Sequence, residues 1–183
     1  MIMQRTWAMP DADTFSIAPI RDFVRKHVSG RAVVVDPFAR NEVAFATVTN
    51  DLNPETFAQH HMDAVDFLTM LADKGEQADA VIFDPPYSPR QIAECYKAAG
   101  LTVTMKDTQS ARFKAECRTQ IRRLLKVGGV VLSFGWNTVG HGEEFRLDEV
   151  LVVCHGGDHN DTLCIAETRV AQQMRLFNHE RDA

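Results

Sequence analysis

Short apolar segments alternate along this chain with segments of helical periodicity, and this alternation limits the folds that it can adopt. The strand-like segments are residues 31–35, 43–49, 80–83, 130–134, 149–154 and 162–166. Several of them are apolar on both faces, which is typical of a parallel sheet covered by helices on both sides. The pattern therefore predicts a doubly wound α/β sheet, and we expect residues 1–183 to form a single domain.

The helical segments and the last connection refine this prediction. Residues 15–27, 63–74 and 110–126 have the apolar periodicity of amphipathic helices. The second of these begins at Asp63, which can cap it, and is followed by Gly75. The last two strand-like segments are joined only by residues 155–161, which is too short for a parallel crossover, so we expect an antiparallel hairpin.

Composition limits the classes of partner. The formal net charge of -5 argues against general binding of polyanions, so any contact with nucleic acid must be local. No apolar run approaches the roughly 20 residues of a membrane-spanning helix, and the four cysteines show no CxxC spacing. We therefore expect a cytoplasmic protein that makes no membrane contact. A metal is not expected, because His155 and His159 lack a partnering pair of cysteines.

An acid follows each of the first four expected strands: Asp36, Asp51, Asp63 (after a short third strand around residues 60–62) and Asp84. In an open α/β sheet, ligands bind beyond the carboxyl ends of the strands. Acids gathered there would repel one another unless a ligand rich in hydroxyl and amino donors lay between them. The alternative is that each acid is only a helix cap or a turn residue.

The stretch VIFDPPY at residues 81–87, together with LLKVGGVVLSFGW at residues 124–136, resembles the S-adenosylmethionine-dependent adenine (amino) DNA methyltransferases with a DPPY motif. The resemblance covers about residues 14–170 and implies a seven-stranded sheet of order 3-2-1-4-5-7-6, with a terminal antiparallel hairpin. It also implies that S-adenosylmethionine is the cofactor. By the same resemblance the cofactor-binding residues are Phe15 and Ile17 near its methionine end, Asp36, Pro37 and Phe38 in the first loop, Asp51 at the ribose and Asp63 at the adenine amino group.

The first loop departs from the family pattern. Family members continue it as DPFxGxG, whereas this chain reads Asp-Pro-Phe-Ala-Arg-Asn, without a glycine. Only about fifteen residues separate Asp36 from Asp51, and the next segment before Asp63 is equally short. We therefore expect a compact cofactor face in which loops replace helices.

The DPPY residues suit the activation of an amine. The lone pair of an exocyclic adenine amine is delocalised into the ring, so the amine needs acceptors for its hydrogens. Asp84 and the carbonyl of Pro85 can be those acceptors, while Pro85 and Pro86 remove competing N–H groups. Tyr87 can stack on the base, which must be flipped out of a duplex or already unpaired.

Other residues are candidates for contact with nucleic acid. Lys114, Arg118 and Arg122, with Lys126, recur every four residues, and we expect them on one helix face, opposite the apolar stripe. Ser88 and Arg90 could form a lip over the base, Trp136 could stack on one, and the hairpin with His155 and His159 could probe a groove. The alternatives are a solvated helix face and a packed tryptophan.

The prediction from the sequence is methyl transfer from S-adenosylmethionine to the N6 amino group of adenine in DNA. One rival is an RNA amino-methyltransferase with the same fold. Another is a degenerate methyltransferase fold kept as a binding module, which the glycine-free loop favours.

Overall fold

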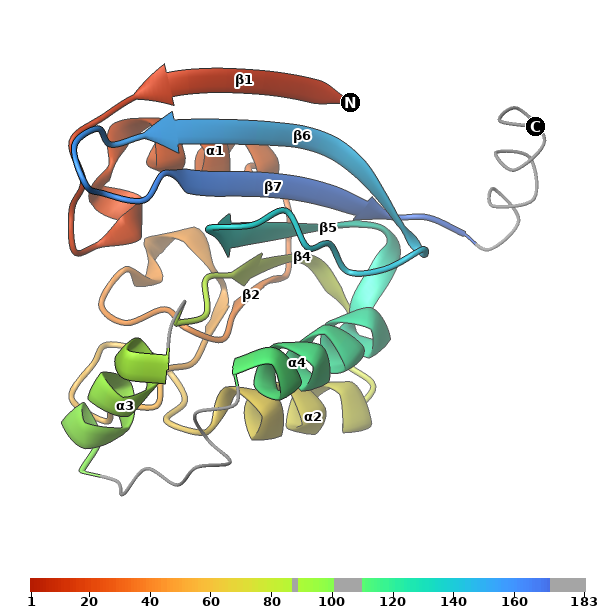
Figure 1. The fold of residues 1–183 in the computed structure, drawn as a ribbon. Helices are drawn as coiled ribbons and strands as arrows, with labels where there is room; N and C mark the ends of the chain where they lie inside the picture. The colour runs from red at the N-terminus through yellow and green to blue at the C-terminus, as the bar shows by residue number, and fades with distance from the viewer. Residues whose placement is uncertain (87–88, 101–109, 172–183) are drawn as a thin grey trace.

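The computed structural model describes residues 1–86, 89–100 and 110–171, and these form a seven-stranded sheet with helices on both faces (Figure 1). The strands are β1 (Ile2–Trp7), β2 (Val34–Asp36), β3 (Val48–Thr49), β4 (Ala78–Phe83), β5 (Leu125–Gly135), β6 (Phe145–Cys154) and β7 (Thr162–Arg169). Their order is β1-β6-β7-β5-β4-β2-β3, and among these strands β7 alone runs antiparallel to its neighbours. The predicted doubly wound sheet with an antiparallel hairpin is confirmed.

Helices cover the two faces unequally. One face carries α1 (Ala18–Val28), from which Ile20 and Val24 join a core with Leu132 of β5. The other face carries α2 (Ala64–Asp73) and α4 (Ser110–Leu124), which lie side by side (Figure 1). A further helix, α3 (Pro89–Ala98), lies apart from this pair, and two 3-10 turns, η1 (Thr14–Ser16) and η2 (Val43–Phe45), complete the described elements.

The strand order agrees with the expected one except at the two edges of the sheet. One edge lacks a predicted strand, and the other has a strand that was not predicted. The expected third strand at residues 60–62 is reduced to a single bridge between Asn50 and His60. At the opposite edge the unexpected strand β1 pairs in parallel with β6. Most of the side chains of β1 are exposed, so it carries no apolar alternation that could have revealed it.

Several predicted boundaries shift in the structure, and two of them change an element. Residues 43–49 do not form one strand, because Val43–Phe45 is the turn η2 and only Val48–Thr49 pairs with β2. The first predicted helix begins at Ala18, where Pro19 suits the first turn of a helix, and not at residue 15.

The crossovers between β2 and α2 contain no α-helix in the described chain, so the expectation of loops in place of helices is confirmed.

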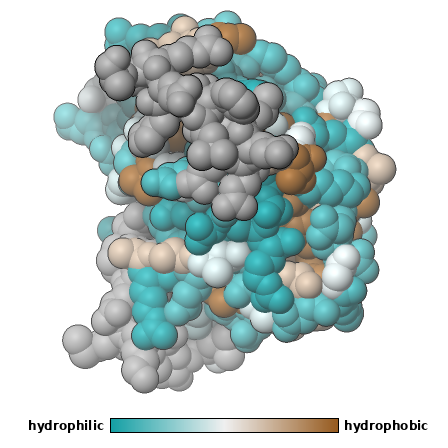
Figure 2. Space-filling view, turned by 90° about the vertical axis from the view of Figure 1, so that its right-hand side faces the viewer, coloured by the Kyte–Doolittle hydropathy of each residue, from teal (hydrophilic) through white to brown (hydrophobic). Residues whose placement is uncertain are grey.

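The parallel strands bring their carboxyl ends to one edge of the sheet, which Figure 1 shows on its left-hand side. The opposite edge faces the viewer in Figure 2, where the described residues are mostly hydrophilic and the hydrophobic ones form small separate patches. Within the described part of the chain, no helix combines the length and apolarity needed to cross a bilayer. The carboxyl edge is therefore the place to look for a site.

Candidate functional site

Two neighbouring cavities lie at the carboxyl edge among the described residues. The larger, which we call the cleft, has a volume of ≈ 380 Å³ and is bordered by Thr14, Asp51, Asp84, Pro85 and Pro86. The smaller, which we call the side pocket, has a volume of ≈ 70 Å³. Its lining residues are Pro37, Phe38, Asp51, Leu52, Met62, Asp63, Ala64, Pro86, Ile92, Cys95, Tyr96 and Phe113. The two cavities share Phe38, Asp51, Leu52, Pro86 and Cys95, so one ligand could extend across both.

Asp36 lines neither cavity, but it lies near enough to Asp84 and Asp51 of the cleft for their charges to act on it. Its side chain is buried, its Oδ1 accepts a hydrogen bond of 2.8 Å from the Phe38 amide, and its Oδ2 has no partner in the structure. Burial raises the pKa of Asp36 well above its usual range, and the charges of Asp84 and Asp51 raise it further. The predicted gathering of acids is therefore seen for these three residues.

Asp51 holds the glycine-free loop in place. Its Oδ2 accepts a hydrogen bond of 3.1 Å from the Arg40 amide, and its Oδ1 accepts one of 2.8 Å from the Asn53 amide. Arg40 has a left-handed φ of 49°, a conformation that glycine adopts without strain. The Arg40 guanidinium also donates to the Ala12 carbonyl and pairs with Asp13 at 2.9 Å. The loop thus has a glycine-like turn, and hydrogen bonds and an ion pair with neighbouring residues stabilise it.

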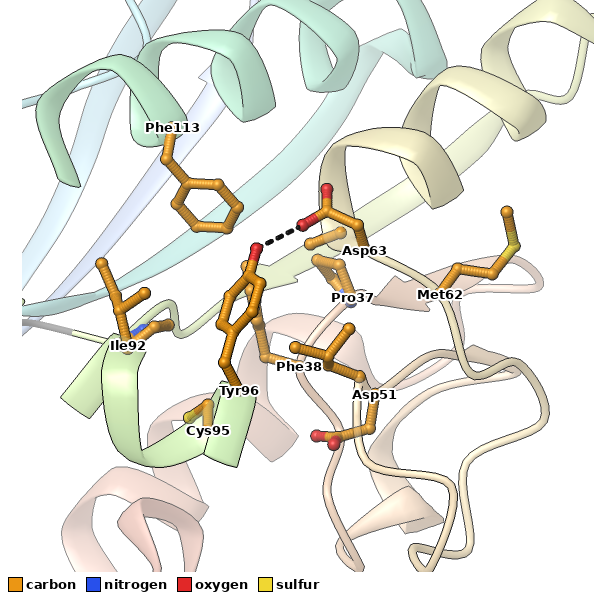
Figure 3. Close-up of a pocket in the computed structure, with 12 residues that line it drawn as sticks. Pro37, Phe38, Asp51, Met62, Asp63, Ile92, Cys95, Tyr96 and Phe113 are labelled. Atoms are coloured by element: carbon orange, nitrogen blue, oxygen red, sulfur yellow. Dashed lines mark hydrogen bonds between the residues drawn. The ribbon is translucent and has the colours of Figure 1, made fainter. Parts of the chain in front are cut away.

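Asp63 links two helices at the side pocket. Its Oδ1 accepts a hydrogen bond of 2.8 Å from the Val65 amide and so caps α2, as predicted. Its Oδ2 accepts a hydrogen bond of 3.1 Å from the Tyr96 hydroxyl of α3 (Figure 3). Phe113 and Ile92 lie beside the Tyr96 ring in this view. The side pocket therefore has apolar walls and a carboxylate at one side.

The DPPY motif begins where β4 ends. Phe83 packs edge to face against Phe38 at 5.8 Å and against His141 at 5.6 Å between ring centroids, which anchors the end of the strand. Asp84 and Pro85 then border the cleft, and Pro86 borders both cavities. Tyr87 and Ser88 lie outside the described residues.

The segment expected near the methionine end of the cofactor divides its residues between core and cleft. Phe15 and Ile17 are buried, and Phe15 packs against Phe134 at 5.2 Å and Phe45 at 5.9 Å between ring centroids. Thr14 and Ala12 border the cleft instead. Phe15 and Ile17 therefore anchor this segment in the core, while Thr14 and Ala12 face the cleft.

The basic residues of α4 were predicted to lie opposite its apolar stripe. In the structure they lie beside it. Lys114, Arg118 and Arg122 are half-buried because each follows directly after an inward-facing residue of the helix. Burial and the neighbouring Arg118 lower the pKa of Lys114, against the opposing effect of Asp84. Lys126 belongs to β5 and binds Asp79 at 2.6 Å, so it is not part of this row.

The remaining rim residues differ in exposure. Trp136 follows β5 and is 46% exposed, and Arg90 is exposed and pairs with Glu94 at 2.8 Å. His159 is exposed in the hairpin. His155 is buried, and its ring nitrogens lie 3.0 Å from the Ala8 carbonyl and 2.9 Å from the Thr162 hydroxyl. A direct contact from the His155 ring to a ligand would have to replace these bonds.

Helix α3 supplies residues that the sequence analysis did not include. Gln91 and Glu94 border the cleft, Ile92 and Tyr96 border the side pocket, and Cys95 borders both. Two features of the sequence could have indicated this helix: a proline at its first position, and the apolar pair Ile92 and Tyr96 at helical spacing. The described residues contain no group of three or more His, Cys, Asp or Glu side chains arranged to hold a metal ion.

Comparison with known proteins agrees with this architecture. Neither a protein-family model nor a curated protein sequence matches this chain. Among solved structures, TrmN from Thermus thermophilus has a TM-score of 0.57 at 13% identity, with 84% of this chain and 49% of that chain covered. A provisionally assigned SAM-dependent methyltransferase from Streptococcus mutans has a TM-score of 0.52 at 14% identity, with 80% and 46% covered.

The yhhF protein from Escherichia coli, also provisionally assigned as a methyltransferase, has a TM-score of 0.54 at 13% identity, with 90% of this chain and 91% of that chain covered. The chain thus spans about half the length of the first two structures and nearly all of the third. At this level of identity the likeness establishes the fold. The chain has the α/β fold of these methyltransferases.

Proposed function

We propose that this protein transfers a methyl group from S-adenosylmethionine to the N6 amino group of adenine in DNA. The observation that carries the proposal is the position of Asp84 and Pro85, which border a cleft at the carboxyl edge of the sheet beside the acids Asp36 and Asp51. The cleft volume of ≈ 380 Å³ lies within the range of about 300–1,000 Å³ typical of small-molecule sites.

The residues present suit an adenosyl cofactor. Asp63 offers a carboxylate beside apolar walls, which suits a purine with an amino group, and Asp51 lies where both cavities meet, which suits ribose hydroxyls. The provisional assignment of the Streptococcus mutans neighbour as SAM-dependent supports the same choice. When bound, S-adenosylmethionine supplies a methyl group on a sulfonium.

The residues of the chain then activate the amine. The Asp84 carboxylate and the Pro85 carbonyl accept hydrogen bonds from its two N–H groups and turn its lone pair away from the ring. The prolines keep both acceptors rigid and add no competing N–H donor. Orientation and preorganised polar groups supply most of the acceleration, so Asp84 need not be a strong base. In the proposed role, Tyr87 stacks on the extruded base.

Two alternatives share this fold. An RNA amino-methyltransferase would use the same acceptors on an unpaired base. A binding module without activity would fit the glycine-free loop and the small side pocket of ≈ 70 Å³. The intact Asp84, Pro85 and Pro86 at the cleft favour an enzyme.

Methyl transfer with labelled S-adenosylmethionine tests the proposal. Duplex DNA, single-stranded DNA and RNA are offered separately, and the labelled nucleoside is identified as N6-methyladenine. We expect labelled DNA with the wild type, and a rate about 10²–10⁴-fold lower for Asp84→Ala and Asp84→Asn.

Each other outcome has a definite meaning. Equal labelling by the Asp84 variants would contradict the mechanism. Label on RNA alone would favour the first rival. No heat of binding with S-adenosylmethionine or S-adenosylhomocysteine in a calorimeter would favour the binding module.

A further inference from the structure

Tyr96 places an aromatic ring and a hydrogen-bond donor inside the side pocket. Its hydroxyl lies 3.1 Å from Asp63 Oδ2, and Figure 3 shows its ring beside Phe113 and Ile92. The other oxygen, Asp63 Oδ1, is engaged in capping α2 at 2.8 Å from the Val65 amide. Oδ2 is therefore the oxygen that a ligand would use, and a residue of the chain already binds it.

The size of the side pocket fits this interpretation. Its volume of ≈ 70 Å³ is far below the roughly 300–1,000 Å³ of typical small-molecule sites, although its walls are apolar and it adjoins the cleft. Ile92, Cys95 and Tyr96, all from α3, form one side of it. The volume available to a purine is thus set by where α3 and the Tyr96 ring lie.

A phenol and an aminopurine offer the same pair of features to this pocket, namely a flat apolar ring and a donor at its edge. We propose that Tyr96 is an internal competitor for the adenine of the cofactor, with its hydroxyl on the carboxylate oxygen that the adenine amino group must reach. The inference rests on the proposed function. It makes Tyr96 a residue that sets cofactor affinity, and it makes release of α3 from Asp63 a condition of cofactor binding.

Calorimetric titration with S-adenosylhomocysteine tests this proposal. Tyr96→Phe keeps the ring and removes only the competing donor, so it should bind the ligand about tenfold more tightly than the wild type, as expected for one hydrogen bond to a charged group. Lys97→Gln is the matched control, because Lys97 lies on the exposed side of the same helix and borders neither cavity. It should leave the affinity unchanged.

A change of ligand isolates the purine pocket. Adenosine and purine riboside both need the Tyr96 hydroxyl released from Asp63 before their ring can enter, so Tyr96→Phe should gain affinity for both by about the same factor. No gain for either nucleoside, or no gain with S-adenosylhomocysteine in a variant that melts like the wild type, would overturn the proposal.

The proposal and the proposed function can fail separately. Tighter binding by Tyr96→Phe without methyl transfer to any nucleic acid would support the competitor and reject the enzyme. Methyl transfer with unchanged affinity in Tyr96→Phe would support the enzyme and reject the competitor. Absence of ligand binding by both proteins would reject both.

Discussion

Arg40 lies where the pattern DPFxGxG has its first glycine, and its φ of 49° is one that a residue with a Cβ adopts at a cost. Its amide binds Asp51 and its guanidinium binds Ala12 and Asp13, which explains how the turn persists. A glycine-free loop can therefore have the backbone shape of a glycine loop.

Two substitutions of Arg40 separate backbone strain from side-chain bonds. Arg40→Gly and Arg40→Ala lose the same guanidinium contacts, but only glycine relieves the left-handed conformation. We expect the glycine variant to be more stable than the alanine variant by about 1 kcal/mol in denaturant unfolding. Equal stability of the two variants would show that the turn is not strained.

Residue by residue, the acids of the site were predictable and Tyr96 was not. Asp36 and Asp84 follow recognisable apolar segments, so local sequence places them at the edge of the sheet. The contact of Tyr96 with Asp63 joins residues 33 positions apart across two helices, and no local pattern encodes it. Likewise, the burial of Phe15 and Ile17 depends on Phe134 and Phe45, which the sequence does not pair with them.

At the scale of elements, α4 presents its cations along the border of its buried face. Cys117 and Ile121 are fully buried, and the cations that follow them are half-buried. The prediction that the two rows are opposite was wrong, because residues one position apart on a helix differ by only 100°. The row of Lys114, Arg118 and Arg122 therefore lies along the border of the buried face and not on a remote solvated face.

This position predicts the salt dependence of binding. Lys114→Ala and Arg122→Ala should each weaken DNA binding and reduce the slope of log K against log salt by about 0.9 for duplex DNA, if each cation contacts one phosphate. Arg112→Ala is the control, because Arg112 is exposed and pairs with Glu116 at 2.8 Å within the same helix. Slopes that match the wild type in the first two variants would remove α4 from the interface.

The elements that the sequence did not reveal share a physical cause. β1 buries little apolar surface and gains its hydrogen bonds from β6, whose paired residues are 147 positions away in the chain. The turn η2 carries apolar residues that pack on the core without pairing to a strand, so their hydrophobicity resembled that of a strand. Long-range contacts, which local propensity cannot encode, decided both cases.

For the whole molecule, two buried titratable groups act in opposite directions on the pH dependence of the free energy of unfolding. Burial raises the pKa of Asp36, so the folded chain keeps a proton that the unfolded chain releases above about pH 4, and stability falls as pH rises from there. Burial lowers the pKa of His141, which binds Glu167 at 2.9 Å. The unfolded chain therefore gains a proton below about pH 6.5 that folded His141 does not take up, and stability falls as pH drops.

Unfolding free energies measured across pH 4–9 in denaturant check both signs. Relative to Asp36→Asn, the wild type should lose stability as pH rises above about 4, and relative to His141→Gln it should lose stability as pH falls below about 6.5. Each slope is limited to about 1.4 kcal/mol per pH unit. Parallel curves for the wild type and the two variants would contradict the assignment.

The direction of β1 has a practical consequence. Because β1 runs parallel to β4 and β5, its first residue lies at the edge of the sheet away from the cleft, and Met1 is 81% exposed there. A biotin attached at this end of β1 would tether the molecule to a sensor chip with its DPPY edge turned outward. The orientation of the immobilised protein would thus follow from the sheet itself, and long DNA could approach the surface without obstruction from the support.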